Sequence, residues 1–416
     1  MNNLQKFTER LNRINGAIAL EKIDRVPCVP MTETFPYLRQ GHTMAQILYD
    51  ANIATVDNLK YHLDFEPDLA MGCREMIAGE GPMMEKLGMK TLCWAGMPGN
   101  RIDENSVHQF IEKEYLEEDE YDKILTDYSG WVLNELLPRW FTSMESLRNF
   151  NVPGMVRGKA SPVVRQFANG KISETFALLA EVAREGEKLD TIMGAHHQDL
   201  INAGFPMFTC GGLTTAFDAL SDSLRGTLGI MMDLIDQPDK VLEAVDQFHQ
   251  RNLKMVRAQL SMGAPGKFVF IPMHKGFDGF MSPAQYEKFY WPTLKGLVEE
   301  IIKLGGTPLV YTEGKYDSRL ETLADLPAGK CVIHIEEANM ADAKRILGDK
   351  HCLSGGFKSS ILKTHTPDQI RDEVKRFLDV VAVDGGYIFD LDYTLADVSD
   401  EAVYAMFDAV KTYGVY

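Results

Sequence analysis

Short continuous apolar runs alternate with longer amphipathic stretches along most of this chain, and this alternation constrains the fold more than any other feature. Most of the runs lack apolar–polar alternation, which is typical of parallel strands buried on both faces. They are 26-VPCVPM-31, 67-PDLAMG-72, 90-KTLCWAG-96, 267-KFVFIPM-273, 307-TPLVYTE-313, 331-CVIHIE-336, 351-HCLSGG-356 and 387-YIFDLD-392. The sequence therefore predicts a parallel α/β sheet.

Helical stretches with clear start signals separate the later runs. Residues 283–306, 339–349 and 366–381 begin at or just after a capping side chain, namely Ser282, Asn339 and Thr366. Ser, Asn and Thr are preferred at this position because their side chains accept a hydrogen bond from a free amide of the first turn. Strand and helix in regular order, with about eight strands, favour a closed (β/α)8 barrel.

Two regions depart from this rhythm. Apolar residues recur at helical spacing near the start of the chain, so we expect an N-terminal helix within residues 1–24 that packs onto the body. Residues 103–200 are rich in acidic and aromatic side chains and then predominantly helical, and no Pro/Gly/Ser linker sets them apart. We predict one α/β domain over residues 1–416, a distorted barrel with a helical insertion at about 103–200 over one end.

The charge balance excludes one class of partner. The chain of 416 residues has 43 Lys+Arg against 60 Asp+Glu, a formal charge of −17. A nucleic-acid binder needs a basic surface, so we expect none here. No apolar run approaches the roughly 18 residues that cross a bilayer, and no signal peptide is visible. Six scattered cysteines without a C-x-x-C pair fit a reducing compartment, so we predict a cytoplasmic protein.

Candidate site residues are the polar side chains that end the apolar runs, because the carboxyl ends of barrel strands converge on one mouth. His274 and Lys275 follow the run KFVFIPM, and His274 can act as acid, base or metal ligand. Glu313 ends TPLVYTE and precedes a glycine that lets the backbone turn. The alternatives are a structural histidine and a carboxylate paired with Lys315 or Arg319.

Three further carboxylates follow later runs. Glu336 ends CVIHIE, and Asp390 and Asp392 lie two apart, so that a strand would turn both to the same face. His274, Glu313 and Glu336 form a mixed set that could hold Zn²⁺ or another divalent ion, although pairing with Lys or Arg is the default for any single acid. The glycines of 210-CGG-212 do not form a phosphate-binding loop, since no G-K-[ST] follows.

Several segments resemble the uroporphyrinogen decarboxylase superfamily, and within it a decarboxylase-like branch associated with corrinoid-dependent methyltransferases. They are 217-FDALSDSLRGTLGIMMDLIDQPDKVLEAV-245, 270-FIPMHKGFDGFMSPAQYEKFYWPTLK-295, 311-YTEGKYDSRLETLADLP-327 and 343-AKRILGDKHCLSGG-356. The resemblance implies a distorted (β/α)8 barrel. True decarboxylases carry an arginine-rich R-Q-A-G-R-Y signature, and the matching stretch 30-PMTETFPYLRQG-41 has only Arg39, which argues against binding of a polyanion.

The methyltransferase branch binds zinc through His-x-Cys and a later Cys. Here the first position reads Tyr311-Thr312-Glu313 and the later one falls near Asp392, which argues against thiol activation. Oxygen ligands could still hold a zinc that activates an ether or hydroxyl oxygen, or Glu313 or an Asp could act as a plain general acid. The resemblance also implies a corrinoid, carried on a separate corrinoid protein.

We therefore expect a corrinoid-dependent methyltransferase that moves a methyl group between a small methyl ether or amine, or an acceptor, and a corrinoid protein, as in O-demethylation. We expect Glu313, His274, Asp390 and Asp392 to be catalytic. We also expect substrate contacts from Lys275, Arg225 and Tyr311, unless Arg225 forms a structural ion pair with Asp218 or Asp222. The alternatives are a decarboxylase of a tetrapyrrole or smaller acid, and a non-catalytic tetrapyrrole- or partner-binding barrel.

Overall fold

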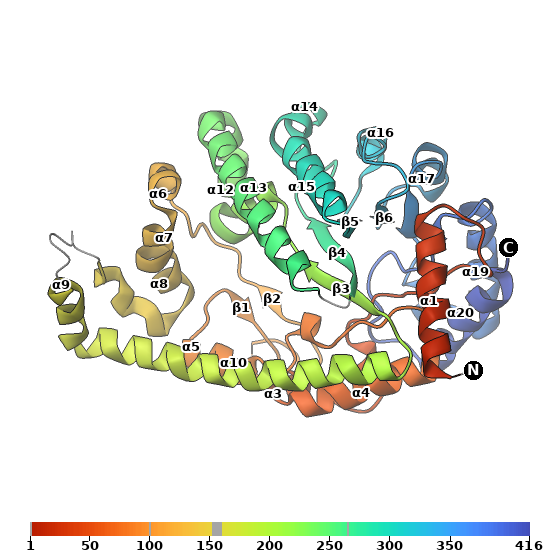
Figure 1. Ribbon diagram of the computed structural model, residues 1–416, viewed down its shortest axis with the longest axis horizontal. Helices are drawn as coiled ribbons and strands as arrows, with labels where there is room; N and C mark the ends of the chain where they lie inside the picture. Colours follow the sequence, from red (N-terminus) through yellow and green to blue (C-terminus); the bar gives the residue numbers. More distant parts are fainter. Residues whose placement is uncertain (1, 100, 152–159, 264–265) are drawn as a thin grey trace.

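The computed structural model describes residues 2–99, 101–151, 160–263 and 266–416 (Figure 1). Its centre is a parallel sheet of six strands that follow one another in chain order. These strands are β3 (Met207–Gly212), β4 (Gly266–Met273), β5 (Thr307–Thr312), β6 (Val332–Ile335), β7 (Cys352–Gly355) and β8 (Tyr387–Ile388). The regular register, for example Tyr311 opposite His334 and His334 opposite Ser354, aligns the carboxyl ends of the strands.

Two N-terminal segments close this sheet into a ring. Cys28 bridges Phe389 just beyond β8, and Ala70 bridges Met207 at the start of β3, both in parallel orientation. The amide of Asp68 donates to the carbonyl of Cys28 at 2.9 Å, which joins the two segments to each other. Eight parallel segments thus form the (β/α)8 barrel that the sequence predicts.

Alternate side chains of every strand fill the barrel. The inner cluster contains Val29, Met31, Leu69, Met71, Phe208, Phe268, Leu309, Tyr311, Val332, Cys352 and Ile388. Ile14, Ala17 and Ile18 of α1 (Asn3–Ile18) belong to the same cluster, so α1 closes one end of the barrel. The helix lies within the predicted range 1–24 and ends earlier, because Leu20 adopts a left-handed conformation with φ of 62°.

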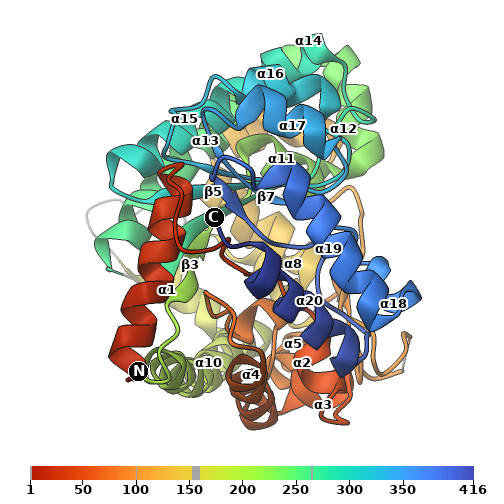
Figure 2. The same ribbon diagram turned by 90° about the vertical axis from the view of Figure 1, so that its right-hand side faces the viewer.

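Capped helices cover the outside of the barrel, as Figure 2 shows for the C-terminal half. The predicted caps Ser282, Asn339 and Thr366 all accept hydrogen bonds from amides of the first turn. The helices and helical turns from β3 onward are α11 (Ala216–Leu220), η7 (Ser221–Arg225), α12 (Gly226–Asp236), α13 (Pro238–Ser261), α14 (Pro283–Gln285), η8 (Tyr286–Tyr290), α15 (Trp291–Lys303), η9 (Asp317–Arg319), α16 (Leu320–Leu323), α17 (Met340–Leu347), α18 (Ile361–Thr364), α19 (Pro367–Val381) and α20 (Asp400–Tyr413).

A helical region precedes β3 and extends beyond the barrel, where α10 (Gly170–Asn202) crosses the molecule (Figure 1). The other elements before β3 are α2 (Phe35–Leu38), α3 (Met44–Tyr49), α4 (Ala51–Phe65), η1 (Arg74–Met76), α5 (Gly81–Leu87), η2 (Glu118–Glu120), α6 (Tyr121–Thr126), α7 (Tyr128–Trp131), η3 (Val132–Leu136), α8 (Leu137–Trp140), η4 (Thr142–Asn149), α9 (Ser161–Val164) and η6 (Arg165–Ala168). No helix within the described ranges is both long and apolar enough to cross a membrane.

The prediction of a barrel strand at 90–96 is wrong. Within it only β1 (Leu92–Cys93) is a strand, and it pairs antiparallel with β2 (Gln109–Phe110) outside the barrel. The barrel strand that the sequence prediction lacks is β3, which contains the glycines of 210-CGG-212. Its register with β4 shifts between Thr209 and Gly211, and Gly211 has a φ of 142°, so the glycine belongs to an irregular strand rather than to a loop.

Candidate active site

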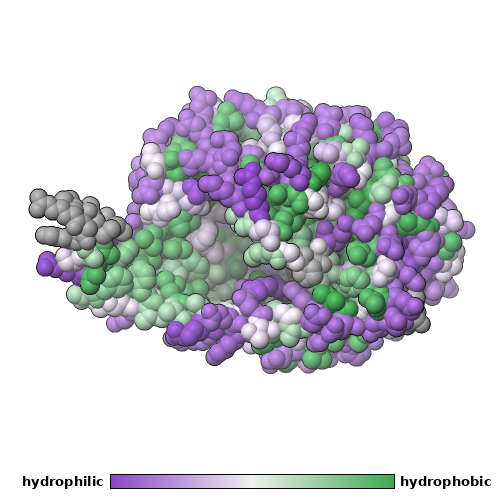
Figure 3. Space-filling model, viewed as in Figure 1, coloured by the Kyte–Doolittle hydropathy of each residue, from purple (hydrophilic) through white to green (hydrophobic). Residues whose placement is uncertain are grey.

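A cavity of about 450 Å³ lies beside the carboxyl ends of β3 and β4. One side is apolar and largely aromatic, and the other carries polar side chains from η7 and from the loop after β4. The molecule is deeply hollowed on the face seen in Figure 3, where β1 and β2 lie in Figure 1. The lining residues are Thr91, Leu92, Phe110, Ile111, Glu112, Tyr115, Trp140, Thr214, Asp222, Ser223, His274 and Lys275.

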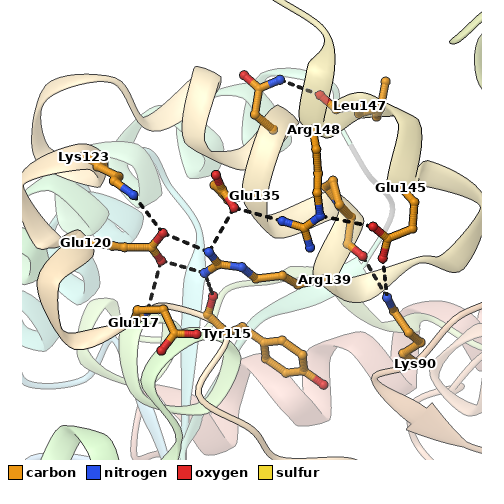
Figure 4. A network of polar contacts seen from close by, with 12 residues as sticks. Lys90, Tyr115, Glu117, Glu120, Lys123, Glu135, Arg139, Glu145, Leu147 and Arg148 are labelled. Atoms are coloured by element: carbon orange, nitrogen blue, oxygen red, sulfur yellow. Dashed lines mark hydrogen bonds and ion pairs between the residues drawn. The ribbon is translucent and has the colours of Figure 1, made fainter.

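A network of ion pairs holds the apolar wall in place (Figure 4). Arg139 donates to both carboxylate oxygens of Glu120 at 2.6 and 2.8 Å and binds Glu135 at 3.0 Å. It also donates to the carbonyl of Tyr115, whose ring packs edge-on against Trp140. Burial raises the pKa of Glu120, but the hydrogen bonds from Arg139 outweigh it and lower the pKa to about 2. The wall is therefore fixed by charges outside the cavity.

His274 stands at the polar end of the cavity and is held on both ring nitrogens. Its Nδ1 lies 2.6 Å from Asp222 Oδ2, and its Nε2 lies 3.4 Å from Glu313 Oε1. Desolvation lowers the pKa of His274, but the hydrogen bonds to Asp222 and Glu313 outweigh this and raise it to about 10. His274 is thus a cation at neutral pH and is suited to donate a proton rather than to accept one.

Asp218 fixes the backbone that carries His274. Its fully buried carboxylate accepts hydrogen bonds from the amides of His274 and Lys275, both at 3.0 Å, and from the Tyr290 hydroxyl at 2.6 Å. Burial and the nearby Asp222 raise the pKa of Asp218 to about 6. Asp218 and Asp222 are four positions apart, and Asp222 lies in η7, a π-helical turn of a kind often found at functional sites. The sequence prediction treated both acids only as possible partners of Arg225.

Glu313 lies beside His274, and Glu336 lies near Glu313 rather than against the imidazole. Glu336 accepts a hydrogen bond from the amide of Gly314, and burial raises the pKa of its carboxyl. Glu313 has no Lys or Arg within ion-pair distance in the part of the chain that the structure describes. The alternative that Glu313 pairs with Lys315 or Arg319 is therefore wrong, because these cations bind Asp317 and Asp278 instead.

Asp390 and Asp392 have different surroundings and different partners. Asp390 is buried, where it accepts a hydrogen bond from the amide of Met31 and lies 3.4 Å from His334 Nδ1. Asp392 binds the amide of Ser359 and lies 3.1 Å from Lys358 Nζ. The expectation of a shared face fails because β8 ends at Ile388, so strand periodicity does not reach these residues. Neither acid lines the cavity among the described residues.

Tyr311 points into the barrel and stacks on His334, with ring centroids 4.0 Å apart. Desolvation and the nearby acids Asp390, Glu313 and Glu336 raise the pKa of its hydroxyl above the usual value. Tyr311 thus stands below the mouth on which His274 and Glu313 converge. Its contact with a substrate stays a prediction.

The two predicted anion anchors have different surroundings. Lys275 lines the cavity, where its Nζ binds Thr227 Oγ1 at 2.8 Å and lies 3.5 Å from Asp222. Arg225 is buried and binds Asp233 at 2.5 Å and the carbonyl of Leu116. The structural ion pair expected for Arg225 therefore exists, but its carboxylate is Asp233 rather than Asp218 or Asp222.

The predicted zinc ligands do not fit a metal ion in this arrangement. Both nitrogens of His274 face carboxylates, and one oxygen of Glu336 is bound to the amide of Gly314. Among the residues that the structure describes, no group of three or more His, Cys, Asp or Glu side chains could hold a metal ion. The described side chains around His274 thus offer acid–base groups rather than a preformed zinc site.

The curated proteins similar to this chain include uroporphyrinogen decarboxylases from several bacteria. The curated uroporphyrinogen decarboxylase of Geobacter metallireducens is 27% identical over 156 residues, 37% of this chain and 43% of that protein. The enzyme of the same name from Aliivibrio salmonicida is 28% identical over 207 residues, 48% of this chain and 53% of that protein. The matched regions thus span about half the length of these curated relatives.

A solved structure described as a methyltransferase from Methanosarcina mazei superposes with a TM-score of 0.60 over 96% of this chain and 97% of that one, at 15% identity. Identity this low supports a common fold only. The family model described as uroporphyrinogen decarboxylase (URO-D) matches residues 155–413, which include β3 to β8 and the residues that position His274. By this match over more than half of its length, the chain belongs to the uroporphyrinogen decarboxylase family.

Proposed function

We propose that this protein transfers a methyl group from a small methyl ether to a corrinoid carried on a separate protein, with His274 as the proton donor. The observation that carries the proposal is the imidazole of His274, held between Asp222 and Glu313 at the edge of an apolar cavity. We place the reaction in the cytoplasm, in keeping with the scattered cysteines of the sequence.

The protonation state of His274 fits the demand of ether cleavage. When the carbon–oxygen bond breaks, the methyl carbon takes an electron pair from its acceptor and the oxygen keeps the bonding pair. The oxygen then needs a proton, which Nε2 of His274 supplies, and Asp222 keeps the ring oriented through Nδ1. A corrinoid would supply the nucleophilic cobalt that accepts the methyl group. In the reverse direction His274 takes the proton back.

The lining of the cavity supports an ether with an apolar or aromatic substituent. Leu92, Ile111 and Trp140 form an apolar wall opposite His274 and Lys275. We favour an ether over a methylamine because a methylamine lacks the apolar substituent that this wall would contact. Proximity supplies the remaining part of catalysis, because the wall holds the methyl group at one end of the cavity.

Decarboxylation is the second candidate, and family membership favours it. A decarboxylase of uroporphyrinogen must bind a ring of carboxylates. Among the described residues that line the cavity, Lys275 is the one side chain with a fixed positive charge, and Glu112 and Asp222 carry negative charge beside it. A polyanion is therefore poorly matched to this cavity, and a smaller monocarboxylic acid is the form of the alternative that remains.

The test is incubation of the protein with a reduced corrinoid protein and a panel of methyl ethers and methylamines, with the cobalt spectrum as readout. We expect methylation with aryl methyl ethers and loss of at least about a hundredfold in rate for His274→Asn. His42→Asn is the matched control, because His42 also lies 2.6 Å from an aspartate, Asp57, at a distance from the cavity. A parallel panel of small carboxylic acids tests the alternative, and carbon dioxide release from one of them without any change at cobalt would favour decarboxylation.

A further inference from the structure

A second cavity, of about 240 Å³, lies beside α1, the helix that closes the barrel. Five of the seven residues that line it are cationic, namely Lys6, Arg10, Arg13, Arg25 and Lys411, and the other two are Glu9 and Glu66. A chain with a formal charge of −17 has thus gathered five cations around one small space.

The cations come largely from one face of α1. Lys6, Arg10 and Arg13 are four and three positions apart, so they lie in one row along the helix. This row faces the protein rather than the solvent, since Arg10 and Arg13 are 6% and 9% exposed. A buried guanidinium group is costly unless carboxylates or other anions neutralise it.

Two of the five cations are fully neutralised. Arg13 binds Asp24 at 2.5 Å and Asp68 at 2.6 Å, and Arg25 binds Asp68 at 2.8 Å. Asp68 is completely buried and also accepts a hydrogen bond from the amide of Cys28. These groups form a rigid, closed network on one side of the cavity.

The other three cations share a single carboxylate. Glu66 lies 2.7 Å from Lys6 and 3.5 Å from Arg10. Lys411 has no carboxylate within ion-pair distance among the described residues. Its Nζ donates to the carbonyl of Phe65 at 3.4 Å and lies 5.8 Å from the centre of the Phe407 ring. Desolvation lowers the pKa of Arg10, and the nearby carboxylates of Asp68 and Glu66 offset this only in part. Positive charge on this side exceeds what the protein supplies to balance it.

We propose that this cavity binds a small oxyanion with two or more negative charges, of the phosphate or pyrophosphate kind, between Lys6, Arg10 and Lys411. Lysine and arginine are the residues that recognise such anions, through point charge and planar hydrogen bonding respectively. The carboxylate of Glu66 already pairs with Lys6 and Arg10, so it competes with the anion for these two cations. Glu9 is exposed at the rim and has no ion pair in the part of the chain that the structure describes.

This position separates the anion from the methyl-transfer chemistry. Arg25 and Asp68 precede the two segments that close the barrel, so the second cavity lies at the end opposite to His274. We therefore expect the bound anion to stabilise the packing of α1 against the barrel and to have no contact with the substrate. A molecule that binds only the folded state raises the melting temperature in a saturable way.

The experiment uses the full chain with inorganic phosphate and pyrophosphate, measured by calorimetry and thermal unfolding against sodium chloride at equal ionic strength. We expect saturable binding and a rise in melting temperature. Lys411→Met should weaken the affinity about tenfold, or about 1.4 kcal/mol. Glu66→Gln should instead strengthen it, because the competing carboxylate is gone, while methyl transfer is unchanged in both variants.

The opposite effects of Lys411→Met and Glu66→Gln on anion affinity distinguish a ligand site from a structural ion network. If both variants only lower the melting temperature and neither changes a binding constant, the cations are structural and the proposal is wrong. It is equally wrong if phosphate and pyrophosphate give no more stabilisation than chloride. Lys411 is only partly buried and donates one long hydrogen bond, so its replacement leaves a folded protein for the measurement.

Discussion

Asp222→Asn is the sharpest test of the proposed proton donor, because it removes one of the three carboxylates, with Glu313 and Asp218, that hold His274 protonated. The pKa of His274 is raised from 6.5 to about 10, with Asp222 at 2.6 Å and Glu313 at 3.4 Å from its ring nitrogens. An opposite charge at such a distance shifts a pKa by about 1–3 units, so the variant should titrate between about 7 and 9. At pH 9 the protonated fraction then falls from about nine-tenths to about one half or less.

The assay is the single-turnover rate of methyl transfer from an aryl methyl ether between pH 6 and 10, with the imidazole resonance of His274 followed by NMR. We expect the alkaline midpoint of the rate to move down by the same interval as the pKa, and the rate at pH 6 to change least. Glu112→Gln is the control, since Glu112 lines the cavity but does not contact His274. A rate lowered equally at every pH, or a wild-type His274 that titrates near 6.5, would refute the reasoning.

Three further outcomes follow from the site and its wall. Glu313→Gln should fold normally and lose at least about a hundredfold in methyl transfer, because the half-exposed Glu313 has no structural cation partner; an unimpaired rate would make Glu313 a bystander. Ile111→Trp should fill part of the cavity beside the apolar wall. Because less room is left for an aryl group, KM in steady-state assays should rise far more for aryl ethers than for dimethyl ether. Glu120→Gln should lower the free energy of unfolding in urea at pH 7 by about 3 kcal/mol, since it leaves Arg139 without its buried carboxylate. Because the pKa of Glu120 is lowered to about 2 from 4.5, this contribution is present above pH 4.5 and disappears as pH falls toward 2, so the two proteins should converge in acid.

The barrel could be predicted because strong local signals mark its elements. Caps such as Ser282 and Thr366 begin helices in the structure, and continuous apolar runs became β4 to β7. The strand β3 was missed because two of its six residues are glycines, which usually mark turns. The run at 90–96 has the composition of a buried strand, but tertiary contacts place it in the cavity wall instead.

The site could be predicted only where strand ends define it. Glu313 meets His274 on one side and approaches Glu336 on the other, because each of the three follows the end of an aligned parallel strand. Asp218 and Asp222 were missed as site residues, although their spacing of four in a helical segment indicates a shared face. Long-range partners such as Asp233 for Arg225 leave no local pattern, so the sequence could not identify them.

The closure of the barrel has a consequence for the order in which the protein folds. The amide of Met31 donates to Asp390, a residue 359 positions away, so the first barrel segments pair with nearly the last. Contacts so distant in sequence form late, because the entropy of a very long loop must be overcome first. Until residues around Asp390 leave the ribosome, the 26–31 segment has no neighbour on that side, and the half-built sheet exposes open edges. Open strand edges promote aggregation. Nascent chains of this protein are therefore expected to depend on chaperones until the residues around Asp390 have been synthesised.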